Sequence, residues 1–437
     1  MTTIDRERSP HGRQRRRELV TSVSDPLLPG RAAALRHLDF RRYQTARFAS
    51  LIGTQMQGVA VAWQVYALTG SPLDLGLVGL AQFLPALVLW PVTGLVADRL
   101  DRRSVIAGCH ALLAICAGLL WWLAQMKQPS LAAIYSVLVI VGIARAFGGP
   151  AGHALAPNLV PRAELPNAIA WGSTIFHLSL ASGPALGGLV YGASSASTVF
   201  VIHGLLEIFS ALLILSLRTR SRGEAQGESS VGAVIAGLRY VIHHKIVLGA
   251  ISLDLFAVLL GGAVALLPIF ARDILHTGPS GLGFLRSAPA LGAAGMAIWL
   301  AARPLMRRTG IVMFSSVFVF GCATIAFALS RNFALSMAAL GVAGAADMVS
   351  VYVRHSLVQL ETPDAMRGRV AAVNLLFIGA SNELGEFESG ITAAWLGTVR
   401  AAVLGGVGTC MVVGLWASLF PELRRVDRLD PSTRNRE

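Results

Sequence analysis

The chain has 437 residues, of which 54% are hydrophobic and only 14% are charged, and its formal net charge is +13. Soluble proteins carry roughly 25% charged residues, so this composition excludes an ordinary soluble protein and indicates an integral membrane protein. The positive charge does not call for a nucleic-acid partner, because the inner loops of membrane proteins are enriched in Lys and Arg. The four cysteines lie in apolar runs without metal-ligand spacing, which predicts buried small side chains and no metal site.

Predominantly apolar segments of about 20 residues, the length that crosses a bilayer as a helix, recur along the chain. A polar tail (1–43) precedes predicted spans at 44–68, 75–98, 104–126, 130–154, 168–192 and 197–217. A polar linker (218–246) precedes spans at 247–271, 282–303, 309–329, 333–357, 370–394 and 399–420, and a second tail (421–437) follows. We therefore predict an all-α integral membrane protein whose twelve transmembrane helices form two six-helix bundles, 44–217 and 247–420.

The distribution of basic residues predicts the orientation. With the N-terminus inside, 29 of the 37 Lys and Arg residues fall on the inner side and 4 on the outer side, so we expect both termini in the cytoplasm. The N-terminal tail lacks the apolar run of a secretory signal. In the linker, VGAVIAGLRYVIHHK (231–245) has a helical apolar stripe and predicts an amphipathic helix on the inner membrane surface.

The two predicted halves resemble each other. SPLDLG (71–76), followed by PAL at 85–87, recurs as GPSGLG (278–283), followed by PAL at 289–291. Two similar six-helix halves that are joined by a cytoplasmic linker are typical of a transporter built from parallel repeats.

The turn between the second and third spans is GLVADRLDRRS (94–104), which concentrates charge in a chain that has little of it. It resembles the G-x-L-A-D-R-x-G-R-R signature of the major facilitator superfamily, and the matching residues are Gly94, Asp98, Arg99, Arg102 and Arg103. Asp101 replaces the usual glycine. LRHLDFRRY (35–43), ARAFGGPA (144–151) and LVPRAELPNAIA (159–170) extend the resemblance, which is to the transmembrane secretion effector branch.

The resemblance implies that this turn latches the two halves together on the cytoplasmic side while the outer side is open. A carboxylate at Asp98 would then cap the partially positive start of the eleventh helix, near Arg369, in one conformation only. The alternative is that the charges only end the spans and set the orientation. The corresponding residue in the second half is Ala302, so a latch would be asymmetric.

Arg145 lies inside the fourth span, where a guanidinium group costs at least about 2.5–3.5 kcal/mol to insert. We expect it to face the interior or a water-filled cavity, in a structural pair or in substrate or proton-coupling chemistry. It resembles the fourth-helix arginine of proton-coupled exporters, although Gly148-Gly149 replaces their Gln-Gly.

The fifth span contains SGPALGGLVYG (182–192), whose small residues four positions apart predict close helix packing. Pro184 lacks a backbone donor and favours a kink. Gly183, Pro184, Gly187 and Gly188 also match the G-P-x-x-G-G element that is typical of exporters in this superfamily. The resemblance therefore favours efflux over uptake.

Carboxylates inside membrane spans usually face a cavity or an ion partner. Six are predicted here: Glu207, Asp254, Asp347, Glu383, Glu386 and Glu388. The resemblance implies that helices 1, 4, 7 and 10 line the cavity, which makes Asp254 and Asp347 candidates for proton coupling or for structural ion pairs. Glu383 and Glu386 share a helix face and are candidates for binding protons or a cationic substrate, or for an interface with Arg286.

Gln55 and Gln64 on the first span are cavity candidates, while Trp63 and Tyr66 also suit a membrane–water interface. His177, His203 and His355 are scattered and predict no ligand site. No phosphate-binding loop is present, so we expect no nucleotide or other cofactor.

These observations predict a monomeric multi-pass protein of a bacterial inner membrane that works by alternating access. The predicted activity is export of a small organic molecule, drug-like or a secreted metabolite such as a siderophore, against protons. Uptake or lipid translocation by the same fold is the alternative. An enzyme or sensor is disfavoured, because no nucleophile–base arrangement stands out and the tails are short.

Overall fold

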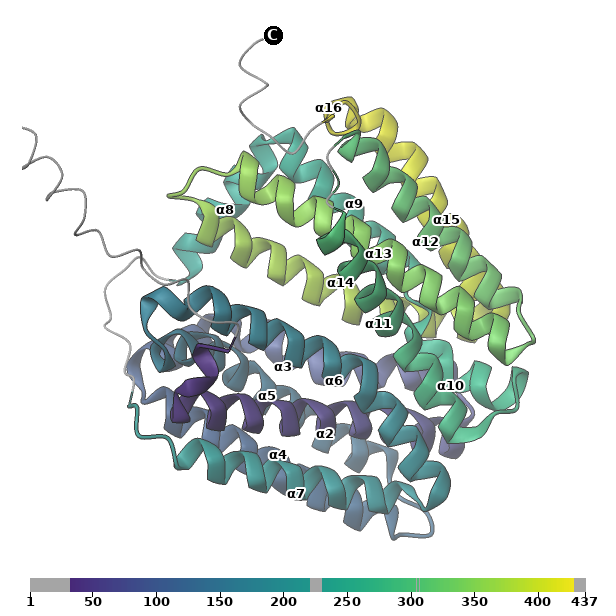
Figure 1. The fold of residues 1–437 in the computed structure, drawn as a ribbon. Helices are drawn as coiled ribbons and strands as arrows, with labels where there is room; N and C mark the ends of the chain where they lie inside the picture. The colour runs from purple at the N-terminus through teal and green to yellow at the C-terminus, as the bar shows by residue number, and fades with distance from the viewer. Residues whose placement is uncertain (1–31, 221–229, 304, 306, 428–437) are drawn as a thin grey trace, which may run out of the picture.

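The computed structural model describes residues 32–220, 230–303, 305 and 307–427 (Figure 1). The first half contains six long helices: α2 (Leu38–Thr69), α3 (Pro72–Arg99), α4 (Arg102–Ala124), α5 (Leu131–Leu155), α6 (Leu165–Ala193) and α7 (Ala196–Leu215). Short 3₁₀ turns accompany them at η1 (Ala34–Arg36), η2 (Ala156–Leu159) and η3 (Arg162–Glu164).

The second half begins with α8 (Ser230–His243), which belongs to the linker. The next helix is interrupted: α9 (Lys245–Gly261) leads into η4 (Ala263–Leu266), α10 (Leu267–Ile269) and a π-helical turn, η5 (Phe270–Ile274). Then follow α11 (Gly278–Ala302), α12 (Thr309–Leu329), α13 (Phe333–Glu361), α14 (Arg367–Leu396), α15 (Thr398–Leu419) and α16 (Pro421–Arg424). The described residues thus contain twelve long helices and no strand, which confirms the predicted fold class.

Several helices begin at residues that satisfy their free backbone N–H groups. The side chain of Ser71 accepts a hydrogen bond from the Asp74 amide at the start of α3, and Asn332 does the same for the Leu335 amide in α13. At the end of α2, Gly70 adopts the left-handed conformation (φ 62°), which glycine reaches without steric cost. These turns reverse the chain sharply between consecutive helices.

Nine of the described helical segments are long and apolar enough to cross a membrane. Three long helices, α2, α6 and α14, fall outside this set, and polar residues in their sequences lower their hydropathy. Large apolar side chains such as Ile169 and Ile298 are nonetheless exposed on the outside of the bundles, as expected for a surface in contact with lipid.

Each half packs as a bundle around its own apolar core. Phe200, Leu120 and Leu138 are buried together in the first half, and Leu253, Met313 and Leu357 in the second. Figure 1 shows α2–α7 forming one bundle and α9–α15 the other, with α8 at one end of the molecule. We call the end that carries α8 and both described termini the linker end, and the opposite end, which carries Gly70 and Gly397, the distal end.

The two bundles contact each other mainly near the distal end, through α6 with α11 and α3 with α14. A Cβ atom on Gly188 would lie 2.8 Å from the Cα atom of Gly283, and one on Gly76 would lie 3.3 Å from the Cα atom of Gly390. Such close backbone approach is how helices associate where water is absent. The Tyr66 hydroxyl also donates a hydrogen bond to Asp273 across this junction. The conformation is therefore closed at the distal end.

The predicted span 247–271 is not one continuous helix. At Gly262 the backbone leaves the helical conformation (φ −71°, ψ 62°), and its carbonyl oxygen accepts a hydrogen bond of 2.9 Å from the Ser389 hydroxyl of α14. Irregular backbone is tolerated at membrane depth where the protein satisfies its polar groups. The break turns Val264, Ala265 and Pro268 toward the space between the bundles.

The linker helix α8 has two apolar faces. Val241 is buried against Val370 and Val373 of α14, and the Tyr240 hydroxyl donates a 2.6 Å hydrogen bond to the Glu361 carbonyl oxygen. A neighbouring side of the helix leaves Ile235, Leu238 and Ile242 exposed. An exposed apolar stripe at the end of a helical bundle supports the prediction that α8 lies against the membrane surface.

The start of the linker is held by Asp39, at the linker end of α2 and ahead of the predicted span. Asp39 accepts hydrogen bonds from the Arg218 amide (3.0 Å), the Thr219 amide (2.9 Å) and the Thr219 hydroxyl (2.7 Å). Burial favours the neutral carboxyl group, but these bonds outweigh it and lower the pKa of Asp39.

We expect Asp39→Ala to release the start of the linker from α2. Because the folded-state pKa is lowered, this attachment is present at neutral pH and is lost only as the pH falls below about 3.9, the ordinary value for Asp. Hydrogen exchange at the Arg218 and Thr219 amides should accelerate in the variant. Asp364→Ala, at an exposed carboxylate, serves as the control. Unchanged exchange at both amides would show that Asp39 does not hold the linker.

Candidate transport cavity between the two halves

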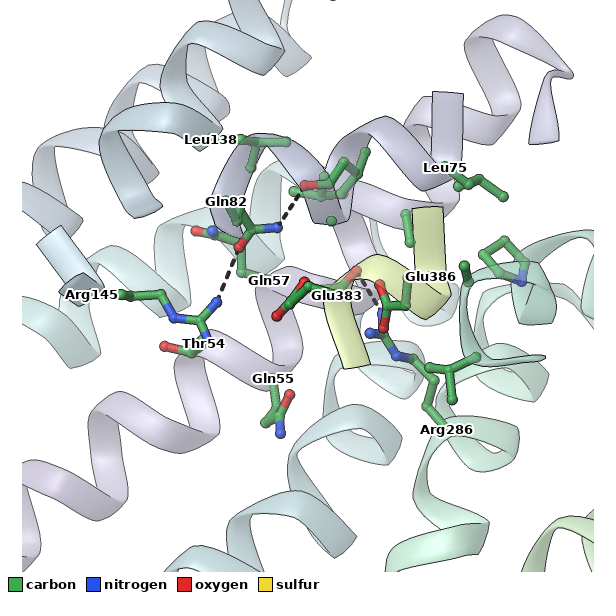
Figure 2. A pocket seen from close by; sticks show the side chains of 18 residues that line it. Thr54, Gln55, Gln57, Leu75, Gln82, Leu138, Arg145, Arg286, Glu383 and Glu386 are labelled. Carbon is green, nitrogen blue, oxygen red and sulfur yellow. Dashed lines mark hydrogen bonds between the residues drawn. The ribbon is translucent and has the colours of Figure 1, made fainter. Parts of the chain in front are cut away.

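A cavity of about 180 Å³ lies between the bundles. The first half contributes α2, α3 and α5, and the second contributes the interrupted helix, α11 and α14. Its polar lining is formed by Thr54, Gln55, Gln57, Gln82, Arg145, Arg286, Glu383 and Glu386. Figure 2 shows these side chains converging from both halves on one space. The cavity therefore joins the two bundles at a polar site inside an otherwise apolar protein.

Among the residues that the structure describes, two guanidinium groups and two carboxylates carry the charge of this cavity. Arg145 donates a 3.3 Å hydrogen bond to the Gln82 side-chain oxygen, and Arg286 donates a 3.1 Å bond to the Gly58 carbonyl oxygen. Within the described part of the chain, Glu383 and Glu386 form neither a hydrogen bond nor an ion pair. Their carboxylates are thus available to a substrate or to protons, with cations from both halves nearby (Figure 2).

Gly79 of α3 makes room for the carboxylates. A Cβ atom at this position would lie 3.1 Å from Oε2 of Glu386 and 3.4 Å from Oε2 of Glu383. Any larger side chain would therefore push these groups out of their present place. The residue at position 79 of α3 therefore limits where the two carboxylates of α14 can lie, although the two helices are far apart in sequence.

Gln57 provides a further polar group. Its side chain is buried and lines the cavity, and its Oε1 atom has no hydrogen-bond partner among the described residues. A buried amide oxygen without a partner costs free energy, which a ligand donor or water would recover. The cavity therefore presents unsatisfied acceptors beside fixed cations.

A second cavity, of about 420 Å³, runs through the first bundle toward the linker end. It is lined by α2, α4, α5, α6 and α7, and includes Tyr43, Arg47, His110 and His153. Thr54 and Arg145 line both cavities. Arg145 therefore stands between the central space and the part of the first bundle that leads to the linker end.

The structure brings some sequence candidates together and separates others. Arg145, Glu383, Glu386 and Gln55 line the central cavity. Gln64 is half-buried but is not part of that lining. Arg286, which the sequence suggested only as a partner for the glutamates, lies on the cavity wall with them.

The two aspartates have different surroundings. Asp254 forms a buried ion pair with Arg354 of α13, which matches the structural alternative for this residue. Asp347 is half-buried, lines neither cavity and makes no hydrogen bond or ion pair within the described ranges. Its role as a coupling group remains a prediction.

The charged turn after α3 binds to its own bundle through two arginines. Arg102 donates a 3.1 Å hydrogen bond to the Ala154 carbonyl oxygen near the end of α5, and Arg103 donates a 2.5 Å bond to the Leu217 carbonyl oxygen just after α7. Guanidinium groups at helix C-termini satisfy free carbonyls and complement the helix dipole. Gly94 is half-buried and Arg99 is exposed. The side chain of Asp98 lies outside the described residues, so the predicted latch stays a prediction.

The glycine-rich segment of α6 contacts both bundles. A Cβ atom on Gly183 or Gly187 would lie 2.6 Å from atoms of Gln55 or Met56 in α2, and one on Gly188 would lie 2.6 Å from the Pro279 carbonyl oxygen at the start of α11. Next to Pro184, the Ala185 amide donates a 3.1 Å hydrogen bond to the Ser287 hydroxyl of α11. This segment is therefore a joint between the bundles as well as a packing motif.

Sequence reasoning missed one cluster in the first bundle. Glu207 of α7 accepts hydrogen bonds from His110 of α4, His203 of α7 and Ser50 of α2. The only local signal was the spacing of His203 and Glu207, which are four residues apart and therefore neighbours on a helix. His110 lies 97 residues away from Glu207, and no local pattern connects them.

In the described part of the chain, twelve long helices in two bundles around a shared polar cavity define a transporter of the major facilitator type. Two solved structures share the fold. A variant of the nucleoside transporter NupG has a TM-score of 0.68 at 16% identity, covering 87% of this chain and 100% of that one. A bacterial homologue of the human lysosomal transporter Spinster, in an inward-facing, unoccupied conformation, has a TM-score of 0.69 at 14% identity, covering 90% and 98%.

The family profile described as transmembrane secretion effector matches residues 30–437, and the chain belongs to this family. It is similar to the enterobactin exporter EntS of Shigella boydii serotype 18, with 27% identity over 399 residues that cover 90% of this chain and 95% of the relative. The protein is therefore a multi-pass membrane transporter, which confirms the resemblance seen in its motifs.

Proposed function

We propose that the protein exports a small organic molecule, either drug-like or a secreted metabolite such as a siderophore, in exchange for protons. The observation that carries this proposal is the central cavity, where Arg145 of one bundle faces Arg286, Glu383 and Glu386 of the other (Figure 2). Because the charges come from both bundles, rocking the bundles changes the site, as alternating access requires. The similarity to an enterobactin exporter supports export and the siderophore class.

Glu383 and Glu386 are the proposed proton carriers of this cavity. When both are ionised, two carboxylates on one helix face repel each other, whereas the two guanidinium groups stabilise them. A substrate that approaches the guanidinium groups alters this balance and favours exchange of a proton for the substrate. Asp254 is assigned a structural role because Arg354 already neutralises it.

The volume of the central cavity limits the size of the substrate that it can hold. A volume of about 180 Å³ is smaller than the roughly 300–1,000 Å³ of sites for drug-sized ligands. The second cavity, of about 420 Å³, shares Thr54 and Arg145 with it. We infer that a siderophore-sized molecule occupies both spaces, and enters while the bundles are apart at the linker end.

The orientation follows from the charge distribution. Since the inner side carries 29 of 37 Lys and Arg residues, the linker end faces the cytoplasm of a bacterial inner membrane. Closure at the distal end then corresponds to an inward-facing conformation, in which an exporter loads its substrate. We propose that the protein acts as a monomer, with the lipid bilayer, the substrate and protons as its partners.

The test uses inverted membrane vesicles with an acidified interior and a pH-sensitive dye. Hydrophobic cations, antibiotics and catecholate siderophores are added in turn, and we expect one class to release protons. Arg286→Gln should abolish this release, because one of the two cavity cations is lost. Arg331→Gln, at an exposed arginine of the distal end, should leave it unchanged.

Labelled substrate distinguishes the alternatives. Accumulation in inverted vesicles without proton release would contradict proton antiport. Accumulation in right-side-out vesicles alone would favour uptake, and transbilayer movement of labelled lipid would favour lipid translocation. Equal proton release with vesicles that lack the protein would exclude any transport assignment from this assay.

A further inference from the structure

A buried acid–histidine cluster in the first bundle lies outside the lining of the central cavity. The Glu207 carboxylate is fully buried and is contacted by His110 Nδ1 (2.6 Å), His203 Nε2 (3.2 Å) and the Ser50 hydroxyl (2.7 Å). The side chain of His203 is 1% exposed, whereas that of His110 is 13% exposed. The cluster joins α2, α4 and α7 in the interior of the bundle.

The surroundings of this cluster do not suit a metal. Within the described residues, no three His, Cys, Asp or Glu side chains converge on a point that could hold a metal ion. Both histidines direct a ring nitrogen at the carboxylate instead. A packing role alone is also costly, because the Nδ1 atom of His203 is buried without a hydrogen-bond partner among the described residues. The geometry places one carboxylate between two imidazole nitrogens, all of which can bind a proton.

The cluster has access to water through His110, which lines the second cavity together with Ser50. The titratable groups that share this cavity are Tyr43 and Arg47 from α2, Cys109 from α4, and Arg145 and His153 from α5. The residues that α6 and α7 contribute to the lining are Phe176 and Ile214, which do not titrate. His110 is thus the member of the cluster through which a proton can exchange with the cavity.

Charge balance indicates what the cluster binds. With both imidazoles neutral, an ionised Glu207 leaves a net charge of −1, and no Lys or Arg among the described residues forms an ion pair with it. A buried charge of this kind is costly unless it is paired. One added proton makes the cluster neutral: a hydronium ion gives its proton to His110, water is released, and an imidazolium–carboxylate pair forms.

We propose that Glu207, His110 and His203 form a proton-binding site, separate from the central cavity, that exchanges protons with the linker end through His110. Proton binding here does not depend on the export function proposed above. Its use in coupling does rest on that function. Arg145, which lines both cavities, is the cation through which substrate in the central space affects the proton at His110.

Infrared difference spectroscopy of the full-length protein in lipid nanodiscs, with ¹⁵N-labelled histidine, tests the proton site without any substrate. The chain has ten histidines, and we expect those of the cluster to contribute an imidazolium signal of their own in the wild-type protein. Glu207→Gln and His110→Gln should each lose this contribution. His153→Gln, at a histidine of the same cavity that does not contact Glu207, should retain it.

A further variant distinguishes loss of the proton site from loss of folding. Glu207→Asp keeps the acid and should recover the signal if the variant without a carboxylate unfolds. An imidazolium signal that is the same in wild-type, Glu207→Gln and His110→Gln protein would overturn the proposal. A signal that is also lost in His153→Gln would overturn the proposal too, because that signal would not come from this cluster.

A second measurement addresses coupling. In vesicles with a proton gradient, Glu207→Gln should retain binding of the transported compound but exchange fewer protons per molecule transported, because Glu383 and Glu386 still carry theirs. If wild-type protein shows the imidazolium signal and transports nothing, the export function fails and the proton site stands. If Glu207→Gln exchanges as many protons per molecule as the wild-type protein, the cluster binds protons without coupling them.

Discussion

The substitution Gly188→Ala is expected to hold the two bundles apart at the distal end. The added methyl group would lie 2.6 Å from the Pro279 carbonyl oxygen and 2.8 Å from the Gly283 Cα atom, and backbone atoms cannot rotate out of the way. Overpacking of this kind costs about 1–3 kcal/mol, which shifts the balance of conformations by about fivefold at the lower figure and about 150-fold at the upper one. The closed distal state should lose population and transport should fall by a similar factor.

Spin labels measure this shift directly. Lys127→Cys and Arg331→Cys place labels at exposed positions near the distal ends of the two bundles, in a protein whose four native cysteines are replaced. The distance distribution should move to longer values in Gly188→Ala. Gly118→Ala is the matched control, because no atom of the described residues lies within 4 Å of its added Cβ atom. Identical distributions in the two variants would exclude the joint as a determinant of closure.

Separating Asp254 from Arg354 should cause the largest loss of stability. Arg354 is 2% exposed and Asp254 is 5% exposed, so each charge depends on the other. Removal of one member of a buried pair typically costs about 3–5 kcal/mol, because the other charge is left unpaired. Asp254→Asn and Arg354→Gln should therefore each lower the thermal unfolding temperature in detergent markedly.

The double variant separates a structural role from a coupling role. Replacing both members with apolar side chains, Asp254→Leu with Arg354→Met, should recover most of the lost stability, since no charge remains buried. If the role of the pair is structural, the double variant should also retain proton-linked transport. If Asp254→Asn unfolds at the wild-type temperature but transports without protons, Asp254 is a coupling group.

Local sequence patterns predicted only part of the candidate site. Glu383 and Glu386 share one face of a helix at a spacing of three residues, so the sequence indicated their joint orientation. The position of Gly79 against their carboxylates links α3 to α14, and no periodicity in either helix contains that contact. The same holds for His110 and Glu207, which meet only because α4 packs against α7.

The interrupted seventh span illustrates a further limit. Its hydropathy predicted one helix over 247–271, because the residues on both sides of Gly262 are equally apolar. At the break, the Gly262 carbonyl oxygen accepts a hydrogen bond from Ser389, which lies in another helix. A hydropathy pattern reports how well a segment suits lipid, but the path of the backbone also depends on partners that satisfy its polar groups.

The sequence by itself determined the membrane class, the twelve helices, their division into halves and the family, because segment length, hydropathy and short motifs are local properties of the chain. Only the tertiary structure decided which polar groups share a cavity, that Asp254 is neutralised by Arg354, and that Glu207 lies between two histidines. The physical reason is that a charge inside a membrane protein is defined by its partners, and those partners come from helices that are distant in sequence.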